Sequence, residues 1–299
     1  MKKLTSLLLT ALIATTLTAG CGTANTTTST DTQTASSAEE TVQENQEKET
    51  KEKFVIVDDN LSNLQLTAPN LPVYDKMTIA QRREKGLPTA LPELTPYSTG
   101  KVAYLTFDDG PENINTIAIL DTLKENNAVA TFYVTGAHAE LYPDVLKRIY
   151  EEGHAIGNHS YDHDYDRLYP SIDGFMSEMM HTDDVIMKIL GVRPMILRAP
   201  GGTIGHFSDI YWQTIKENGY TEHDWNVSSA DAAPNHPVAQ DFIDNIDFGT
   251  SDGKESAIIL MHCSEGHEET AKALPKIIQI LKDRGYTFGV ITPMTPQPW

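Results

Sequence analysis

The chain has 299 residues, and its 23 Lys and Arg against 42 Asp and Glu give a formal net charge of −19. This length fits one large domain of the barrel type or two ordinary domains. So acidic a chain argues against nucleic acid and anionic lipid as partners, because both are polyanions. Hydrophobic residues make up 39% of the chain although its N-terminal stretch is polar, so the remainder can bury a normal core.

The first 20 residues have the composition of a signal peptide. Lys2 and Lys3 supply positive charge, residues 7–17 form a short apolar run, and two small residues precede Cys21. The run is too short to span a membrane comfortably. Small residues before a cysteine resemble a bacterial lipobox, in which the cysteine is diacylated and becomes the mature N-terminus. We expect an exported protein that meets the membrane only through lipid on Cys21, on the extracellular face, with plain secretion as the alternative.

The segment that follows is polar and poor in large side chains. Residues 21–53 are rich in Thr, Ser, Ala, Gln and Glu, so they cannot bury enough surface to offset ordering entropy, and we expect a flexible tether. Cys263 is the only other cysteine, so a lipidated Cys21 leaves the folded part without a disulfide. Residues 54–100 are rich in Pro and weakly periodic, which predicts an irregular N-terminal extension that packs on the following domain.

From residue 101 to residue 299, short apolar runs alternate with helical patterns that end in Gly or Asn. Strands that alternate with helices predict parallel βα units, hence an open doubly wound sheet or a barrel. The expected strands are 102–107, 129–134, 155–157, 195–197, 220–224, 257–261 and 287–291. The expected helices are 117–124, 145–152, 175–190, 209–217 and 271–282. The expected left-handed residues at helix ends are Asn126, Gly153, Gly191, Gly219 and Gly285.

Five polar clusters lie where five of the expected strands end. The carboxyl ends of strands form the functional face of βα architectures, so we expect the clusters to converge on one pocket. Taken singly, each has an ordinary explanation; an Asp pair before Gly-Pro, for example, is common turn chemistry. Their convergence is therefore the argument for a site. The clusters are 106–111, 158–163, 198–202, 228–231 and 261–262.

Two of these clusters predict a metal site. His159 and His163, with one carboxylate, make a three-ligand set that leaves a coordination position open, as in catalytic zinc sites. A metal there lowers the pKa of its bound water towards about 7 and polarises a substrate carbonyl. Either Asp108 or Asp109 is expected to ligate the metal, and the other to accept the proton of the water. Zn²⁺ suits the set best, and Co²⁺, Ni²⁺ or Mn²⁺ fit the same ligands.

The remaining clusters supply acid–base and electrostatic groups. His262 is expected to protonate the leaving nitrogen, a step typically worth about 10²–10⁴-fold in rate. Arg198 is expected to orient the base, and Asp231 to orient His262 and raise its pKa. A backbone N–H at Gly201 is expected to face the developing oxyanion, a contact worth about 10²–10³-fold.

These clusters, in this order, resemble the NodB-homology polysaccharide deacetylases, carbohydrate esterase family 4, from about Lys101 to Met294. The combination of Thr-Phe-Asp-Asp-Gly-Pro at 106–111 with His-Ser-Tyr-Asp-His at 159–163 is highly specific. The resemblance implies an α/β fold, a distorted (β/α) barrel with fewer than eight regular strands. It also implies metal-dependent hydrolysis of N-acetyl groups on glucosamine polymers.

The resemblance also assigns the carboxylate roles that the residues alone left open. Asp108 matches the family's catalytic base, and Asp109 matches a metal ligand. The other positions that match the family, in the roles given above, are His159, His163, Arg198, Asp231 and His262.

Three departures from the family pattern bear on substrate fit more than on the reaction. Ala232 follows Asp231 where the family often has Trp, and Trp225 is the nearby aromatic residue expected to line the site. Gly201 stands where the loop often carries Tyr, which leaves the backbone donor in place. Cys263 follows the acid where Asp is frequent, and we expect a small hydrophobe there and not a metal ligand.

The expected substrate is an N-acetylated aminosugar polymer, and peptidoglycan is favoured because a lipid anchor on a tether holds the domain within reach of the wall. A chitin-like exopolysaccharide or acetylated xylan is the alternative substrate. N-acetylmuramic acid is disfavoured, because relatives that act on it usually have Asn where this chain has Asp109. The alternative of another class is a non-catalytic carbohydrate-binding lipoprotein, against which the complete set of base, ligands and acid argues.

Overall fold

The computed structural model describes residues 53–66, 68–97 and 100–298, all of which belong to one compact unit. The expected signal peptide, Cys21 and all but the last residue of the expected tether lie outside these residues. Within the described ranges, no helix combines the length and the apolar character needed to cross a membrane.

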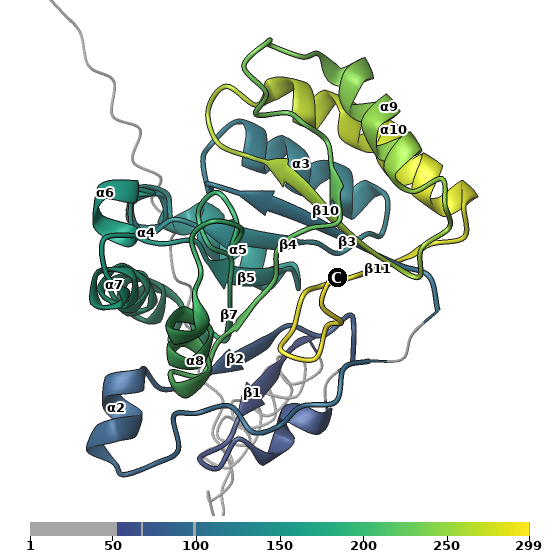
Figure 1. Cartoon of the computed structure of the whole chain (residues 1–299). Helices are drawn as coiled ribbons and strands as arrows, with labels where there is room; N and C mark the ends of the chain where they lie inside the picture. The colour runs from purple at the N-terminus through teal and green to yellow at the C-terminus, as the bar shows by residue number, and fades with distance from the viewer. Residues whose placement is uncertain (1–52, 67, 98–99, 299) are drawn as a thin grey trace, which may run out of the picture. The chain divides into compact units, whose positions relative to one another are not determined.

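The main sheet is parallel and curls into a half-barrel (Figure 1). Seven strands form one path, and β11 (Thr287–Gly289) pairs with β3 outside it. In path order the strands are β8 (Thr221–Glu222), β7 (Ile196–Leu197), β5 (Ala155–Asn158), β4 (Thr131–Val134), β3 (Val102–Asp108), β10 (Ser256–His262) and β9 (Val227–Ser228). Because β8 and β9 end the path and have two residues each, the expected distorted barrel with fewer than eight regular strands is confirmed.

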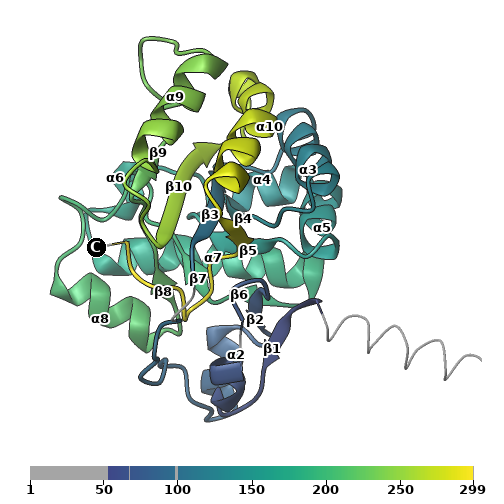
Figure 2. The same cartoon turned by 90° about the vertical axis from the view of Figure 1, so that its right-hand side faces the viewer.

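Helices connect these strands and cover the outside of the sheet (Figure 2). Helix α10 packs against both α3 and α9, and α7 packs against α4, α5, α6 and α8. The helices of this domain are α3 (Asn115–Glu125), α4 (Gly136–Leu141), α5 (Pro143–Glu151), α6 (Tyr165–Leu168), α7 (Ile172–Leu190), α8 (Asp209–Glu217), α9 (Ala239–Gly249) and α10 (Glu268–Asp283).

The helix ends follow the predicted glycine pattern with one exception. Gly153, Gly191, Gly219 and Gly285 have φ values between 75° and 83°, as predicted. After α3 the left-handed residue is Asn127, with φ of 50°, and not Asn126. The prediction failed by one residue because the Asn126 N–H still bonds to carbonyls of the last helical turn.

Strands β3 and β10 form the centre of the sheet and align two of the predicted site residues. All seven residues of β3 are buried, which explains its continuous apolar and β-branched sequence. The strands pair in register from Ser256 and Val102 to His262 and Asp108. Asp108 and His262 therefore end side by side at the carboxyl edge.

The N-terminal extension packs on the barrel and contains more regular structure than its composition suggests. Strands β1 (Val55–Val57) and β2 (Val73–Asp75) join β6 (Arg193–Pro194) in a second, three-stranded sheet. A 3-10 helix, η1 (Ser62–Leu66), and helix α2 (Ile79–Glu84) complete it. Strands of two or three residues carry too little alternation to be recognised in a Pro-rich sequence.

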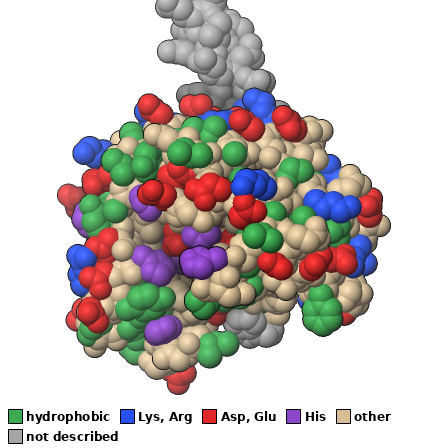
Figure 3. Space-filling view, turned by 90° about the horizontal axis from the view of Figure 1, so that it is seen from above, with side chains coloured by type: hydrophobic (Ala, Val, Ile, Leu, Met, Phe, Trp, Pro, Cys, Tyr) green, Lys and Arg blue, Asp and Glu red, His purple; other side chains and the backbone are tan. Residues whose placement is uncertain are grey.

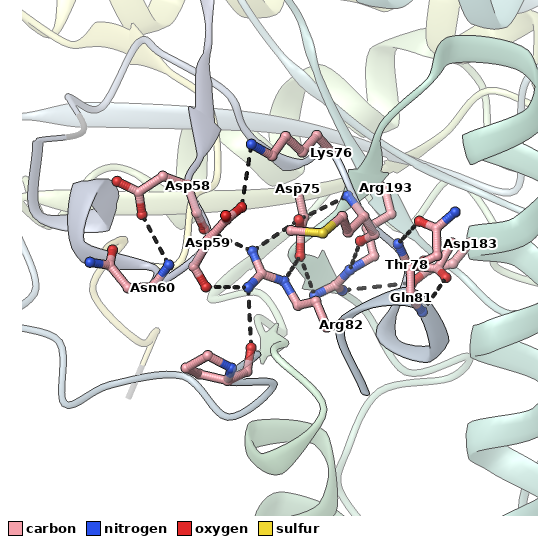
Figure 4. Close-up of polar contacts among 12 residues, drawn as sticks. Asp58, Asp59, Asn60, Asp75, Lys76, Thr78, Gln81, Arg82, Asp183 and Arg193 are labelled. Carbon is pink, nitrogen blue, oxygen red and sulfur yellow. Dashed lines mark hydrogen bonds and ion pairs between the residues drawn. The ribbon is translucent and has the colours of Figure 1, made fainter. Parts of the chain in front are cut away.

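A buried ionic network ties this extension to the barrel (Figure 4). Asp75 Oδ2 accepts from Arg82 Nε at 2.5 Å and from Arg193 Nη2 at 3.2 Å. Arg193 Nη1 lies 3.6 Å from Asp183 Oδ2 of α7. These four side chains are at most 3% exposed. Buried charges are costly unless they are paired, so neither part can keep this arrangement without the other.

Candidate active site

The five polar clusters converge at the carboxyl edge of the main sheet, as the parallel topology requires. Four residues in the loops just beyond β3, β5 and β9 adopt left-handed φ values between 61° and 71° although none is Gly: Asp109, Ser160, His163 and Ala230. Such conformations cost about 1–3 kcal/mol each and cluster at functional sites. Figure 3 shows a face where histidine side chains gather around a recess with acidic side chains inside it.

The three predicted metal ligands come together at this edge of the sheet. Asp109 Oδ1 lies 3.4 Å from His159 Nε2 and 3.7 Å from His163 Nε2. One ligand atom of each residue lies within 4.8 Å of the others. The two histidines approach because the left-handed Ser160 and His163 fold the loop back, and the Ser160 hydroxyl accepts the His163 N–H at 3.1 Å. The arrangement has the size and donor types of a one-ion site.

Two observations show that these residues fit a divalent cation such as Zn²⁺. The Asp109 Oδ1 atom is buried and has no hydrogen-bond partner in the described structure, so its lone pairs are available. His159 Nδ1 is 2.8 Å from the Arg198 carbonyl, which can only accept, so Nδ1 carries the proton and Nε2 is left free to ligate. Burial alone raises the pKa of Asp109, but the adjacent His159 imidazole, together with the charges of His262 and His163, holds it well below its usual range.

Asp108 is held by a fully buried arginine. Arg198 Nη1 donates to Asp108 Oδ1 at 3.0 Å and to the Thr106 hydroxyl at 2.7 Å. Its other nitrogens donate to the carbonyls of His223 and Asp224 at 2.9 and 3.2 Å. Asp108 Oδ2 points elsewhere, to within 3.8 Å of His159 Nε2. One oxygen of Asp108 is thus anchored while the other faces the cluster of possible ligands, the geometry that a general base needs.

His262 is held by Asp231 in a fixed orientation. Asp231 Oδ1 lies 2.8 Å from His262 Nδ1, and Oδ2 accepts from the His262 N–H at 2.7 Å and the Thr270 hydroxyl at 2.8 Å. This leaves Nε2 of His262 available to a substrate. Burial alone lowers the pKa of His262, but the hydrogen bond and charge of Asp231 outweigh it and raise the pKa to about 9.

The glycine-rich loop and Trp225 border a cavity of about 130 Å³ beside these groups, lined also by Thr203, Ile204 and Asp224. Gly201 has φ of 76°, and its N–H has no hydrogen-bond partner in the described part of the chain. The Arg198 guanidinium lies 5.7 Å from the Trp225 ring centroid. Both residues that were predicted to meet the substrate are therefore next to the site, and their roles remain predictions.

Cys263 lies close to the site but is not one of the residues whose ligand atoms cluster together. It is fully buried in the main hydrophobic core, and its thiol lies 3.5 Å from the Asp108 carbonyl. A Cβ on Gly110 would come within 2.5 Å of its sulfur. Burial raises the pKa of this thiol, so it stays protonated. This agrees with the expectation of a small hydrophobe.

Sequence reasoning missed three residues that hold the predicted ones in place. The Thr106 hydroxyl and the Asp224 carbonyl both accept from Arg198, and the Thr270 hydroxyl donates to Asp231. Thr106 had a signal, because it lies two residues before Asp108 on one strand and so faces the same side. Thr270 had none, because it lies on α10, far from Asp231 in sequence.

Comparison with known proteins shows which family this chain is similar to. Residues 96–223 match the family model described as polysaccharide deacetylase. The chain is 35% identical to a peptidoglycan-N-acetylglucosamine deacetylase of Bacillus cereus over 192 residues, 63% of this chain and 68% of that protein. It is 34% identical to a peptidoglycan-N-acetylmuramic acid deacetylase of Bacillus subtilis, over 64% of this chain and 70% of that protein.

Solved structures are similar over the same region. A polysaccharide deacetylase from Bacillus cereus superposes with a TM-score of 0.60 at 34% identity, over 66% of this chain and 94% of that one. The catalytic domain of a peptidoglycan N-acetylglucosamine deacetylase from Eubacterium rectale gives 0.61 at 31% identity, over 69% and 95%. Fold and site thus define a hydrolase built on a distorted (β/α) barrel. The chain belongs to the polysaccharide deacetylase family, which confirms the resemblance seen in the sequence.

Proposed function

We propose that this chain hydrolyses N-acetyl groups of N-acetylglucosamine residues in peptidoglycan, with one divalent metal ion held by Asp109, His159 and His163. The observation that carries the proposal is one strand edge that holds this ligand set, Asp108 anchored by Arg198, and His262 anchored by Asp231. A binding protein has no need of an acid, a base and a ligand set in mutual contact.

The bound ion, Zn²⁺ by preference, supplies a water of lowered pKa and polarises the acyl oxygen. Asp108 Oδ2 accepts a proton from the attacking water as the water oxygen bonds to the acyl carbon. The carbonyl electron pair moves to the acyl oxygen. The Gly201 N–H donates to that oxygen. When the carbon–nitrogen bond breaks, His262 Nε2 gives its proton to the amine, and acetate and a free amino sugar are released. Asp231 keeps His262 protonated for this step.

Peptidoglycan is favoured among aminosugar polymers because three of the four proteins reported above have names that specify peptidoglycan. N-acetylglucosamine is favoured over N-acetylmuramic acid because Asp109 fits the ligand position, where relatives that act on muramic acid usually have Asn. The alternatives that an assay must separate are a chitin-like exopolysaccharide and acetylated xylan.

The test is acetate release by the full chain loaded with Zn²⁺ or Co²⁺. The substrates are intact peptidoglycan, N-acetylglucosamine oligomers and acetylated xylan, and the controls are Asp108→Asn and a chelated sample. We expect acetate from the aminosugar substrates, with a fall of at least about 10²-fold for Asp108→Asn. Acetate from xylan alone would make the protein an esterase, and no acetate from a metal-loaded chain would favour the binding protein.

We further propose that lipid on Cys21 anchors the exported chain to the extracellular face of the membrane. The support is the order of basic residues, apolar run, small residues and cysteine at the N-terminus. The test is phase partition in detergent of the wild type and Cys21→Ala expressed in a bacterium. Recovery of both from the aqueous phase contradicts the anchor.

A further inference from the structure

Tyr165 lies against the candidate active site, and its hydroxyl group has no hydrogen-bond partner among the residues that the structure describes. It is the first residue of α6, two residues after His163, and 43% of it is exposed. Its ring makes an edge contact with the His163 ring, with centroids 5.4 Å apart. No hydrogen bond joins its hydroxyl to a residue in the described part of the chain. A phenol in this position offers one free donor to whatever occupies the site.

The Tyr165 hydroxyl lies directly over Gly201. A Cβ added to Gly201 would be 2.5 Å from Tyr165 Oη and 3.2 Å from Cε1, so any side chain at 201 would collide with this ring. Because a Cβ lies about 2.5 Å from its own backbone nitrogen, Tyr165 Oη is within about 5 Å of the Gly201 nitrogen. Hydrogen bonds span about 2.9 Å, so one oxygen atom can accept from both donors.

The surroundings fix Tyr165 in this place. The Tyr165 ring also contacts Tyr169 and His206, which stack on each other with centroids 4.0 Å apart. The Tyr169 hydroxyl donates to the Pro200 carbonyl at 2.6 Å, which ties α6 to the loop that carries Gly201. Asp164 caps α6 through the Asp166 N–H at 3.0 Å. Donors held in advance are what stabilises a charge that develops during reaction.

We infer that Tyr165 is a second hydrogen-bond donor to the acyl oxygen, paired with the Gly201 N–H, on the side of the site next to His163. The inference rests on the proposed deacetylation. In this chain the aromatic residue of that part of the site comes from α6, and Gly201 is the residue that makes room for it.

The test compares Tyr165→Phe with the wild type in full chains loaded with Zn²⁺, assayed by acetate release from N-acetylglucosamine oligomers. The oxyanion develops during reaction and is absent from the bound substrate, so we expect kcat to fall by about 10²-fold with little change in KM. A matched control is Tyr161→Phe, because Tyr161 lies in the same loop and its hydroxyl bonds to Glu140 instead, at 3.0 Å. This control is expected to keep wild-type kcat.

Two outcomes overturn the inference. If kcat of Tyr165→Phe stays within about threefold of the wild-type value, Tyr165 is not a second donor to the oxyanion. If KM rises while kcat is unchanged, Tyr165 contacts the substrate in the ground state only. A wild type that binds metal and releases no acetate instead contradicts the proposed function, so the two failures are distinguishable.

A double-mutant cycle with Gly201→Ala distinguishes the proposed contact from a loss of activity that is caused by misfolding of one variant. The added methyl collides with Tyr165 but has room beside an alanine at 165. We therefore expect the loss of kcat caused by Gly201→Ala to be about tenfold smaller in the Tyr165→Ala background. Equal losses in both backgrounds contradict the placement of Tyr165 over Gly201 on which the inference depends. Thermal unfolding of each variant verifies that it is folded.

Discussion

At the scale of the residue, Asp231 and His262 illustrate how one carboxylate sets the protonation state of a candidate acid. Both oxygens of Asp231 are used, one by the imidazole and the other by the His262 N–H and the Thr270 hydroxyl. The carboxylate therefore cannot rotate away, and the pKa of His262 rises to about 9. An acid with this pKa stays protonated throughout the neutral range.

The predicted consequence is a pH dependence that Asp231→Asn shifts. His262 is the acid form below its pKa, so kcat should fall as pH rises through that value. Loss of an adjacent opposite charge lowers the pKa by about 1–3 units, so the alkaline limb should move to lower pH by a similar amount. The measurement is the pH profile of kcat, with Thr270→Val as the control that keeps the charge. An unmoved limb in Asp231→Asn would contradict the role of His262.

At the scale of the element, the predicted pattern of strands and helices agrees with the structure where elements are long or strongly periodic. The seven expected strands and five expected helices are all present. Strands β1, β2, β6 and β9 were missed, and each has only two or three residues in which to show a period. Strands β7, β8 and β11 are as short, but each lies within a longer run that predicted it. Helix α9, with eleven residues, was missed as well, and so were the shorter helices α2, α4 and α6.

The connection between the extension and the barrel gives an element-scale prediction. Asp75→Asn keeps the shape of β2 but leaves Arg82 and Arg193 without their shared counter-charge. Breaking a buried ion pair from one side costs about 3–5 kcal/mol, so the free energy of unfolding should fall by this order. Chemical denaturation measures the change.

The matched control for this prediction is Asp59→Asn. Asp59 pairs with Lys76 at 3.4 Å in an exposed position, and exposed pairs are worth about 0–1 kcal/mol. Equal effects of the two substitutions would show that the buried network does not hold the extension in place.

At the scale of the whole molecule, two buried histidines make the free energy of unfolding depend on pH. Burial lowers the pKa of both His154 and His223 to about 4. The unfolded chain binds protons at these residues near pH 6.5 and the folded chain does not, so stability is present above that pH and is lost as pH falls. Each residue contributes a slope of up to about 1.4 kcal/mol per pH unit between these values.

The prediction is that His154→Gln lowers the number of protons bound on unfolding by about one between about pH 6 and pH 4.5. The slope of the unfolding free energy against pH then falls by up to about 1.4 kcal/mol per pH unit. The measurement is the free energy of unfolding by denaturant across that range. His236→Gln, a substitution at an exposed residue, should leave the slope unchanged. If both variants keep the wild-type slope, His154 is not buried in the neutral form.

The sequence by itself determined the class of fold and most of the residues that form the candidate site. Alternating runs imply parallel strands, and parallel strands place their carboxyl ends at one edge, so residues such as Asp108, His159 and His262 had to converge. Only the tertiary structure decided which side chains from separate loops touch, including Tyr165 over Gly201 and Thr270 on Asp231. The reason is physical: these contacts depend on left-handed loop residues and on helix packing, which no local period encodes.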